Sequence, residues 1–221
     1  MTGRRIFSTD TINAVIEEQA AAQPDAHALS FEGRRYTYGE MNARANRAAN
    51  ALSSLGVSRG DRVVWLARNL PSFWHTLFGA AKIGAVMTPV NWRLAPAEIA
   101  AIVADAQPKI FIAEKMFLDA MAAAGAPSPE NTFTLEGLGE PCFDALVDRS
   151  SDAPTAYRPQ AHDVAIQLYT SGTTGLPKGV LLTNANYAAS GKAGLVTGVI
   201  NPRFDDETVI HALPHFHIAG V

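Results

Sequence analysis

The sequence predicts an α/β fold with a largely parallel sheet that is covered by helices. The first observation is that helical patterns and short apolar runs alternate along the 221 residues, as in chains built from repeated strand–helix units. The second is that runs such as RVVWLA (residues 62–67) are apolar without interruption, which is typical of strands buried on both faces. The third is the composition, 48% hydrophobic and 18% charged, which suits a globular chain with a substantial core.

Helices are predicted where apolar residues recur at helical spacing between start and stop signals. Residues 11–25 have Asp10 or Thr11 as the capping residue and Pro24 as the stop. The other predicted helices cover residues 39–57 (ended by Gly56), 71–84 (opened by Pro71), 95–108, 118–127, 142–150 and 184–199 (capped by Asn184).

Strands are predicted from short apolar runs bounded by turn residues. Residues 27–38 indicate two short strands joined by a turn at Glu32 and Gly33. Residues 163–170 form a clear strand that runs into a glycine-rich stretch, and residues 179–183 form a second strand that leaves it. The remaining predicted strands cover residues 62–67, 85–90, 109–114, 131–137 and 208–214.

The chain divides into three regions on composition. Residues 1–150 form an N-terminal α/β region, residues 151–160 form a polar connector, and residues 161–221 begin a second α/β region. Because the sequence stops directly after a predicted strand, with no element to cover the open sheet, we expect the fold to be cut at Val221. A cut fold should expose a large apolar patch.

Charge and cysteine content narrow the classes of partner and compartment. The formal net charge of -3 provides no basic field, so no nucleic-acid partner is expected. The single cysteine, Cys142, cannot form an internal disulfide and suits a reducing compartment. The most apolar stretch, residues 73–90, is interrupted by His75 and Lys82, so no transmembrane segment is expected. With no secretory signal at the N-terminus, the predicted location is the cytoplasm.

The stretch YTSGTTGLPKG (residues 169–179) has the composition of a polyphosphate-binding loop. Its glycines allow backbone N–H groups to converge on one point, and its hydroxyl groups can rotate toward phosphate oxygens. Lys178 adds a mobile positive charge, and Pro177 stiffens the approach to it. The predicted phosphate-binding residues are Thr170, Ser171, Gly172, Thr173, Thr174 and Gly175.

Other loops with similar composition fit less well. The triphosphatase loop would need glycine at Pro177 and serine or threonine at Gly179, and a hydrolase nucleophile elbow would need glycine at Tyr169. A polar hairpin loop without function is the structural alternative, and Lys178 after the strand and loop favours phosphate binding over it. The cluster His211, His215 and His217 contains no cysteine or acidic residue, which disfavours a zinc site.

Residues 168–186, LYTSGTTGLPKGVLLTNAN, resemble the AMP-binding signature of the adenylate-forming superfamily. This superfamily includes acyl-CoA synthetases, the adenylation domains of non-ribosomal peptide synthetases, and luciferases. Residues 212–221, 34–69 and 84–99 are similar to neighbouring family segments, so the resemblance covers the chain from about Ile12 onward.

The resemblance implies an ATP-dependent acyl-CoA synthetase acting on a fatty or related carboxylic acid. ATP, Mg²⁺ and coenzyme A would take part, with Lys178 and His217 as catalytic residues and Thr170 as a contact of Mg²⁺. Two alternatives stay open: an adenylation domain of the peptide-synthetase type, and a non-catalytic nucleotide-binding or scaffolding module. The sequence is compatible with a homo-oligomer.

The family motifs that hold ribose, adenine and Mg²⁺, and a small C-terminal domain with its own catalytic lysine, are not found in these 221 residues. A phosphate-binding loop without the residues that enclose ribose and adenine leaves a site that is open to water and binds nucleotide weakly. The resemblance therefore implies that the fragment alone is inactive.

Overall fold

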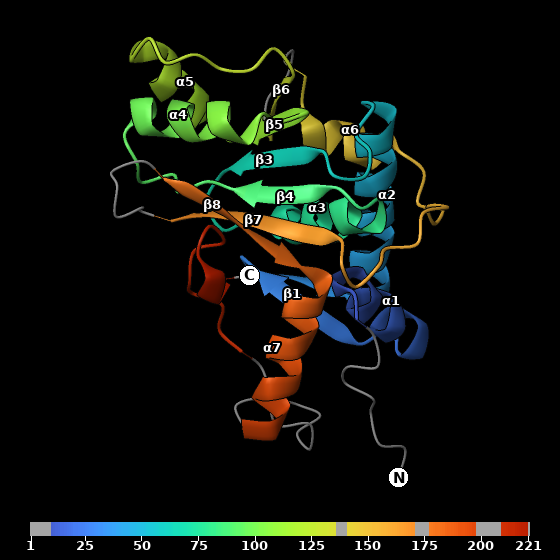
Figure 1. Cartoon of the computed structure of the whole chain (residues 1–221). Helices are drawn as coiled ribbons and strands as arrows, with labels where there is room; N and C mark the ends of the chain where they lie inside the picture. The colour runs from blue at the N-terminus through green and yellow to red at the C-terminus, as the bar shows by residue number, and fades with distance from the viewer. Residues whose placement is uncertain (1–9, 136–140, 171–176, 198–208, 221) are drawn as a thin grey trace.

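The computed structural model describes residues 10–135, 141–170, 177–197 and 209–220, and it confirms the α/β fold (Figure 1). A six-stranded sheet with the strand order β6-β5-β3-β4-β7-β8 forms its centre. Every pair of neighbouring strands in it is parallel except β7 and β8. The strands of this sheet are β3 (Arg62–Leu66), β4 (Val86–Pro89), β5 (Ile110–Ala113), β6 (Thr132–Thr134), β7 (Val164–Thr170) and β8 (Lys178–Thr183).

A separate antiparallel pair precedes the sheet, as the sequence predicts. It consists of β1 (His27–Phe31) and β2 (Arg34–Thr37), joined at Glu32 and Gly33, which both have positive φ. Glycine adopts that backbone region readily, which explains its use in this turn.

Helices cover the two faces of the sheet unequally. Helices α2, α3 and α6 pack on one face, whereas α4 and α5 cover the other face mainly over β3 and β5 (Figure 1). The helices of the described residues are α1 (Ile12–Ala22), α2 (Tyr38–Ser54), α3 (Pro71–Lys82), α4 (Pro96–Ala106), α5 (Lys115–Ala123), α6 (Phe143–Arg149), α7 (Asn184–Thr197) and the 3-10 turn η1 (Ile218–Gly220).

The core lies between the sheet and helices α2 and α3. Trp65 on β3 and Phe73 on α3 are fully buried there, in an edge-to-face arrangement with ring centroids 5.9 Å apart. Gly79 permits α2 and α3 to approach closely, because a Cβ atom at that position would lie 2.8 Å from Ala45 O and from Ala48 Cβ.

Two sequence predictions are wrong in this part of the fold. Residues 209–214 form no strand, because no neighbouring strand pairs with them among the residues that the structure describes. Asn184 is the first residue of α7 rather than its cap. Thr183 takes that role: its Oγ1 accepts the backbone N–H of Asn186, and Oδ1 of Asn186 accepts the N–H of Thr183.

The connector over residues 151–160 is held on the surface of α2. Asn50 Nδ2 donates hydrogen bonds to the carbonyls of Ser151 and Ala153, and Arg47 binds the carboxylate of Asp152. After the connector, β7 pairs with β4, so strands from both sides of it lie in one sheet. The boundaries of the three predicted regions stay a prediction. None of the helices that the structure describes combines the length and apolarity needed to cross a bilayer.

Candidate functional site

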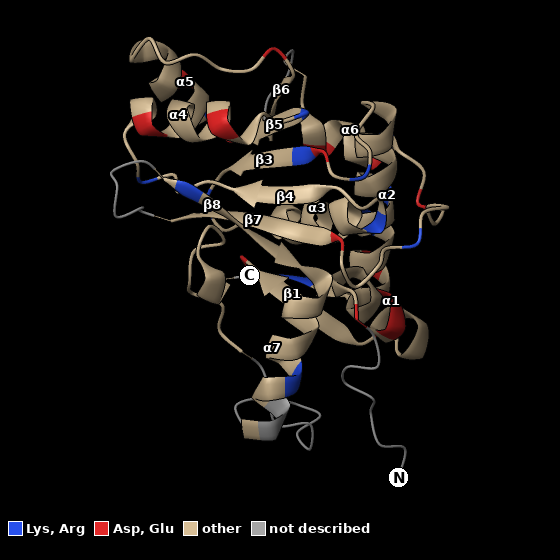
Figure 2. Ribbon diagram, in the orientation of Figure 1, with Lys and Arg blue, Asp and Glu red and all other residues tan. Residues whose placement is uncertain are grey.

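The first part of the site is the end of the β7–β8 hairpin. Thr170, the last residue of β7, pairs with Lys178, the first residue of β8, and both are exposed. Figure 2 shows the basic residue at the start of β8 beside the grey trace. Five of the predicted phosphate-binding residues lie outside the described part of the chain: Ser171, Gly172, Thr173, Thr174 and Gly175. Their role stays a prediction, whereas Thr170 and Lys178 are brought together.

Thr170 stands at the carboxyl edge of the parallel strands. Because β3, β4 and β7 run in the same direction, the residues that follow them meet at one edge of the sheet. Open α/β sheets bind their ligands outside this edge. The edge therefore defines a candidate site with Thr170 and Lys178 on its hairpin side.

The segment 209–220 docks at the same edge. The backbone N–H of His215 donates to Oδ1 of Asn69, and Asn69 Nδ2 donates to the carbonyl of Leu213. Asn69 follows β3 in the chain. Phe216 packs edge-on against Trp92, which follows β4, with ring centroids 6.3 Å apart. The segment is thus anchored to the carboxyl ends of two strands (Figure 1).

His217 is exposed at this edge, at the start of the final turn. Its Nδ1 accepts a hydrogen bond of 3.2 Å from the backbone N–H of Ala219. When the imidazole is neutral, its proton is therefore on Nε2, which has no hydrogen-bonding partner among the residues that the structure describes. His217 can donate a hydrogen bond from Nε2 to a carboxylate.

His215 has a different role from His217. Its ring stacks on Phe73 at a centroid distance of 4.1 Å and lies edge-on to Trp74 at 5.2 Å. It is buried, and neither of its ring nitrogens has a hydrogen bond within the described structure. Burial, and then the neighbouring His211, lower the pKa of His215 to about 3. His215 therefore packs as a neutral aromatic ring that anchors the segment beside His217.

The base of the hairpin is held by Asp163, which sequence reasoning missed. Its Oδ2 accepts hydrogen bonds from Tyr157 Oη (2.8 Å) and Gln160 N (2.7 Å), and its Oδ1 pairs with Arg59 Nη2 at 2.7 Å. Burial alone would raise the pKa of Asp163, but these hydrogen bonds and the Arg59 charge outweigh it and lower that pKa. Asn184 closes the hairpin from β8, since its N–H donates to the carbonyl of Asp163.

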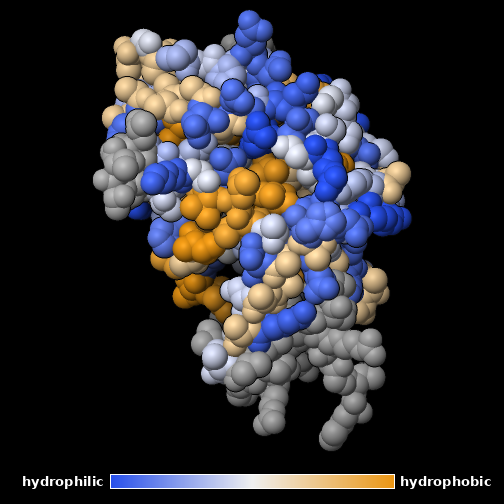
Figure 3. Space-filling view, in the orientation of Figure 1, coloured by the Kyte–Doolittle hydropathy of each residue, from blue (hydrophilic) through white to orange (hydrophobic). Residues whose placement is uncertain are grey.

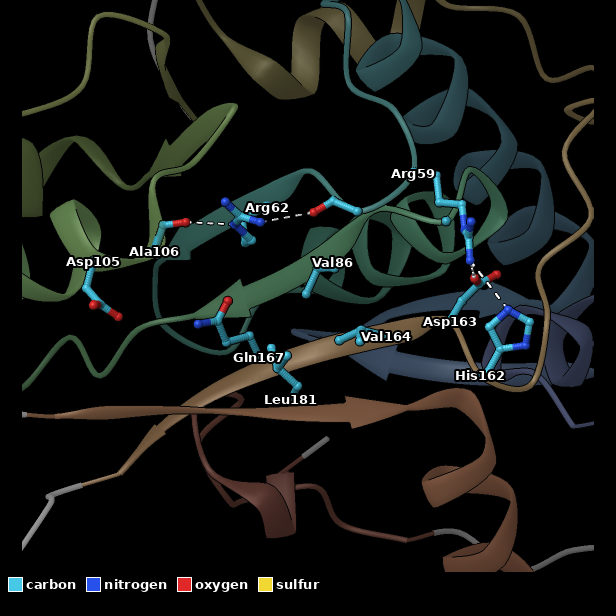
Figure 4. Close-up of a pocket in the computed structure, with 12 residues that line it drawn as sticks. Arg59, Arg62, Val86, Asp105, Ala106, His162, Asp163, Val164, Gln167 and Leu181 are labelled. Atoms are coloured by element: carbon cyan, nitrogen blue, oxygen red, sulfur yellow. Dashed lines mark hydrogen bonds and ion pairs between the residues drawn. The ribbon is translucent and has the colours of Figure 1, made fainter.

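A cavity of about 490 Å³ lies beside Asp163, at the amino ends of β3, β4 and β7 (Figure 4). Arg62 and Asp105 line it on one side, and His162 and Asp163 on the other. Because Thr170 is at the opposite end of β7, this cavity is separate from the candidate nucleotide site. Arg59 and Arg62 are engaged with Asp163 and with the carbonyl of Ala106, so they serve the fold.

The described residues supply few ligands for a metal ion. No group of three histidine, cysteine, aspartate or glutamate side chains is placed to hold one, as far as the structure describes the chain. Thr170 offers a single exposed hydroxyl oxygen. Because Mg²⁺ in such sites is bound largely through water and substrate phosphates, one hydroxyl ligand is compatible with an ion that arrives with ATP.

Comparisons with known proteins identify the family. A model of the family described as "AMP-binding enzyme" matches residues 16–221. The chain is 37% identical over 209 residues to a fatty acid–[acyl-carrier-protein] ligase of Streptomyces coeruleorubidus, covering 91% of this chain and 38% of the relative. It is 37% identical over 219 residues to a long-chain-fatty-acid–CoA ligase of Mycobacterium tuberculosis, covering 95% of this chain and 42% of the relative. A feruloyl-CoA synthase of an Amycolatopsis species is 34% identical over 203 residues, covering 92% of this chain and 39% of the relative.

Solved structures agree with these relatives. The inhibitor-bound N-terminal domain of FACL13 from Mycobacterium tuberculosis superposes with a TM-score of 0.82 at 31% identity, covering 96% of this chain and 53% of that one. The chain spans about two fifths of the length of the relatives named above. The resemblance of residues 168–186 is confirmed, and the chain belongs to the AMP-binding enzyme family.

Proposed function

We propose that the protein containing this chain activates a carboxylic acid with ATP and transfers the acyl group to a thiol. In the first step a carboxylate oxygen attacks the α-phosphorus of ATP, the bond to the leaving pyrophosphate breaks, and an acyl-adenylate forms. In the second step the thiol sulfur attacks the acyl carbon, AMP leaves, and the thiol proton passes to solvent. Support comes from the family match and from relatives that are named as acid–thiol ligases.

The observation that carries this proposal is the Thr170–Lys178 pair at the carboxyl edge of the sheet. Negative charge accumulates on the pyrophosphate as it departs, and an ammonium group with a hydroxyl donor stabilises that charge. We assign Lys178 to the stabilisation of this pyrophosphate charge. We assign Thr170 as a second hydrogen-bond donor and as a ligand of the Mg²⁺ that ATP carries. Mg²⁺ supplies further neutralisation of the phosphate charge when it is bound.

His217 is assigned to the acyl side of the reaction. Its Nε2 proton can hydrogen-bond one oxygen of the substrate carboxylate and orient the other oxygen for attack. We assign it as an orienting group rather than a base, because a carboxylate needs no deprotonation at neutral pH.

The substrate class follows from the relatives. Two of those named above act, by their names, on fatty acids, so a fatty or related carboxylic acid is the proposed substrate. Coenzyme A is the proposed thiol. An acyl-carrier protein is the second candidate, because the Streptomyces relative is named for it.

The test is ATP–pyrophosphate exchange with a panel of carboxylic acids, measured on the complete product of the gene that encodes residues 1–221. Replacing Lys178 by alanine should slow the exchange about 10- to 100-fold, the range expected for losing a charge-assisted hydrogen bond. Lys192→Ala is the matched control, since Lys192 is an exposed lysine on α7 that pairs with Asp10. Unchanged exchange in Lys178→Ala would contradict the assignment.

The same assay separates the alternatives. ATP binding without exchange for any acid would favour the non-catalytic nucleotide-binding module. Exchange with amino acids alone would favour an adenylation domain of the peptide-synthetase type. We also propose that residues 1–221 on their own do not catalyse the exchange, and robust turnover by this piece would refute that part.

A further inference from the structure

The tyrosine that precedes Thr170 is tied to a helix that lies far away in the sequence. Tyr169 Oη donates a hydrogen bond of 2.6 Å to Oδ2 of Asp105, in the last turn of α4. The two residues are 64 positions apart. A hydroxyl that donates to a carboxylate forms a charge-assisted hydrogen bond, which is among the stronger side-chain interactions.

Asp105 is placed where helix stability does not favour it. The carboxyl end of a helix carries partial negative charge, so a carboxylate in the last turn is unfavourable for the helix. No basic residue lies in the last turn of α4 to offset it. The carboxylate of Asp105 therefore stabilises the fold at this position through the hydrogen bond that it accepts from Tyr169.

The neighbouring strand is shaped around the Tyr169 side chain. Gly179 pairs with Tyr169 across the hairpin, and a Cβ atom at Gly179 would clash with Nε2 of Gln167 and lie 3.3 Å from Cζ of Tyr169. Gln167 Nε2 also donates to Tyr169 Oη at 3.2 Å. The hydroxyl is thus held between a donor on β7 and an acceptor on α4, and the ring lies over a glycine.

Tyr169 remains a hydrogen-bond donor at neutral pH. Burial, and then the hydrogen bond to Asp105, raise the pKa of Tyr169 above its usual value. The phenol therefore stays protonated, and its bond to the carboxylate persists over the physiological range.

We propose that Tyr169 is a positioning residue for nucleotide binding, acting through its hydrogen bond to Asp105. The bond holds the end of β7 on α4, and so it sets where Thr170 and its partner Lys178 stand at the carboxyl edge of the sheet. Without it, this end of the hairpin is held chiefly by its ladder to β8, which is the edge strand. The inference rests on the proposed function, since it takes Lys178 to contact the phosphates of ATP.

The test uses calorimetric titration of the complete gene product with ATP and, separately, with AMP. Tyr169→Phe removes only the hydroxyl, and Asp105→Ala removes the acceptor. Each is expected to raise the Kd for ATP about five- to tenfold, the effect of one hydrogen bond, with the Kd for AMP unchanged. The Kd for ATP of the double variant should be no higher than that of either single variant, because the two substitutions remove the same hydrogen bond. Asp105→Asn keeps an acceptor oxygen and should restore most of the affinity for ATP.

Tyr187→Phe is the matched control. Tyr187 lies on α7, and its hydroxyl is buried with no hydrogen bond among the described residues, so its loss should leave the Kd for ATP unchanged. A purely structural role for Tyr169 would weaken ATP and AMP binding together and lower the unfolding midpoint.

Three results would overturn the inference: an unchanged Kd for ATP in Tyr169→Phe, equal losses for ATP and AMP, or additive effects in the double variant. Lys178→Ala distinguishes this failure from failure of the proposed function. If Lys178→Ala weakens ATP binding while Tyr169→Phe does not, only the positioning role falls. If neither variant weakens it, the phosphate assignment falls and the positioning role falls with it.

Discussion

At the scale of single residues, His75 shows how burial controls the charge of a side chain. It lies on α3 with 5% of its surface exposed, and its Nε2 has no hydrogen bond within the described structure. Burial, followed by the positive charges of Arg44 and Arg34, lowers the pKa of His75 to about 3. The folded protein therefore holds this imidazole neutral in a range where the unfolded chain binds a proton.

This shift predicts a loss of stability in mild acid. The pKa of His75 is lower in the folded state than in the unfolded state, so between pH 6.5 and about 3 only the unfolded chain binds a proton there. The stability of the fold is therefore unaffected by this residue above pH 6.5 and decreases as the pH falls toward 3. The free energy of unfolding should fall by up to about 1.4 kcal/mol per pH unit from this one residue. Urea unfolding at several pH values should show a shallower slope for His75→Gln than for the parent chain.

Leu77→Ala is the control for that experiment, since Leu77 is buried on the same helix and carries no ionisable group. It should leave the pH slope as it is in the parent chain. Equal slopes for His75→Gln and the parent chain would show that His75 does not bind a proton on unfolding, and the argument from burial would be wrong.

At the scale of elements, the hairpin that carries Thr170 and Lys178 depends on its base. Asn184 makes three hydrogen bonds there: Oδ1 accepts from Ile12 N, Nδ2 donates to Gln160 O, and its backbone N–H donates to Asp163 O. It joins α1, the connector and β7 to the start of α7. Buried polar groups that are fully paired in this way favour one arrangement of the segments around them.

Removing Asp163 from this base should be costly. Asp163→Ala deletes a buried acceptor that three hydrogen bonds share, those from Tyr157, Gln160 and Arg59, so the free energy of unfolding should fall by about 2–3 kcal/mol. Asp152→Ala is the control: Asp152 forms an exposed ion pair with Arg47, for which a loss of about 0–1 kcal/mol is expected. Both losses can be measured by urea unfolding, and equal losses would contradict the role of Asp163.

At the scale of the whole molecule, one face is apolar and exposed. Figure 3 shows a hydrophobic surface over the region where β7 and β8 lie in Figure 1. Leu181 on β8 is 56% exposed. Helices α4 and α5 cover this side of the sheet over β3 and β5 but do not extend to β8. Exposed apolar surface of this kind promotes association with other molecules.

The isolated chain should therefore self-associate through this face. Leu181→Lys places a charge on it and should weaken the association about tenfold or more, because burying an unpaired charge in an interface is costly. Sedimentation velocity over a range of concentrations would measure the change. Met116→Lys is the control, since Met116 is 54% exposed on α5, outside the apolar face. An equal effect of both variants, or none from Leu181→Lys, would contradict a specific role for β8.

Much of the fold could be predicted from local patterns. The helix over residues 39–57 and the strand over residues 62–67 appear as α2 and β3, because helical periodicity and an apolar run are properties of adjacent residues. The strand predicted over residues 208–214 did not form within the described residues, because a strand depends on a partner that its own sequence does not contain.

The sequence by itself determined most of the helices and strands and their order, the family, and the choice of Thr170, Lys178 and His217 as candidate site residues. Only the tertiary structure decided that β7 joins β4, that Asp105 meets Tyr169, and that His215 is buried while His217 is exposed. The physical reason is that propensity and motif depend on neighbours along the chain. Burial, strand pairing and hydrogen-bond partners depend on residues that come together only when the chain folds.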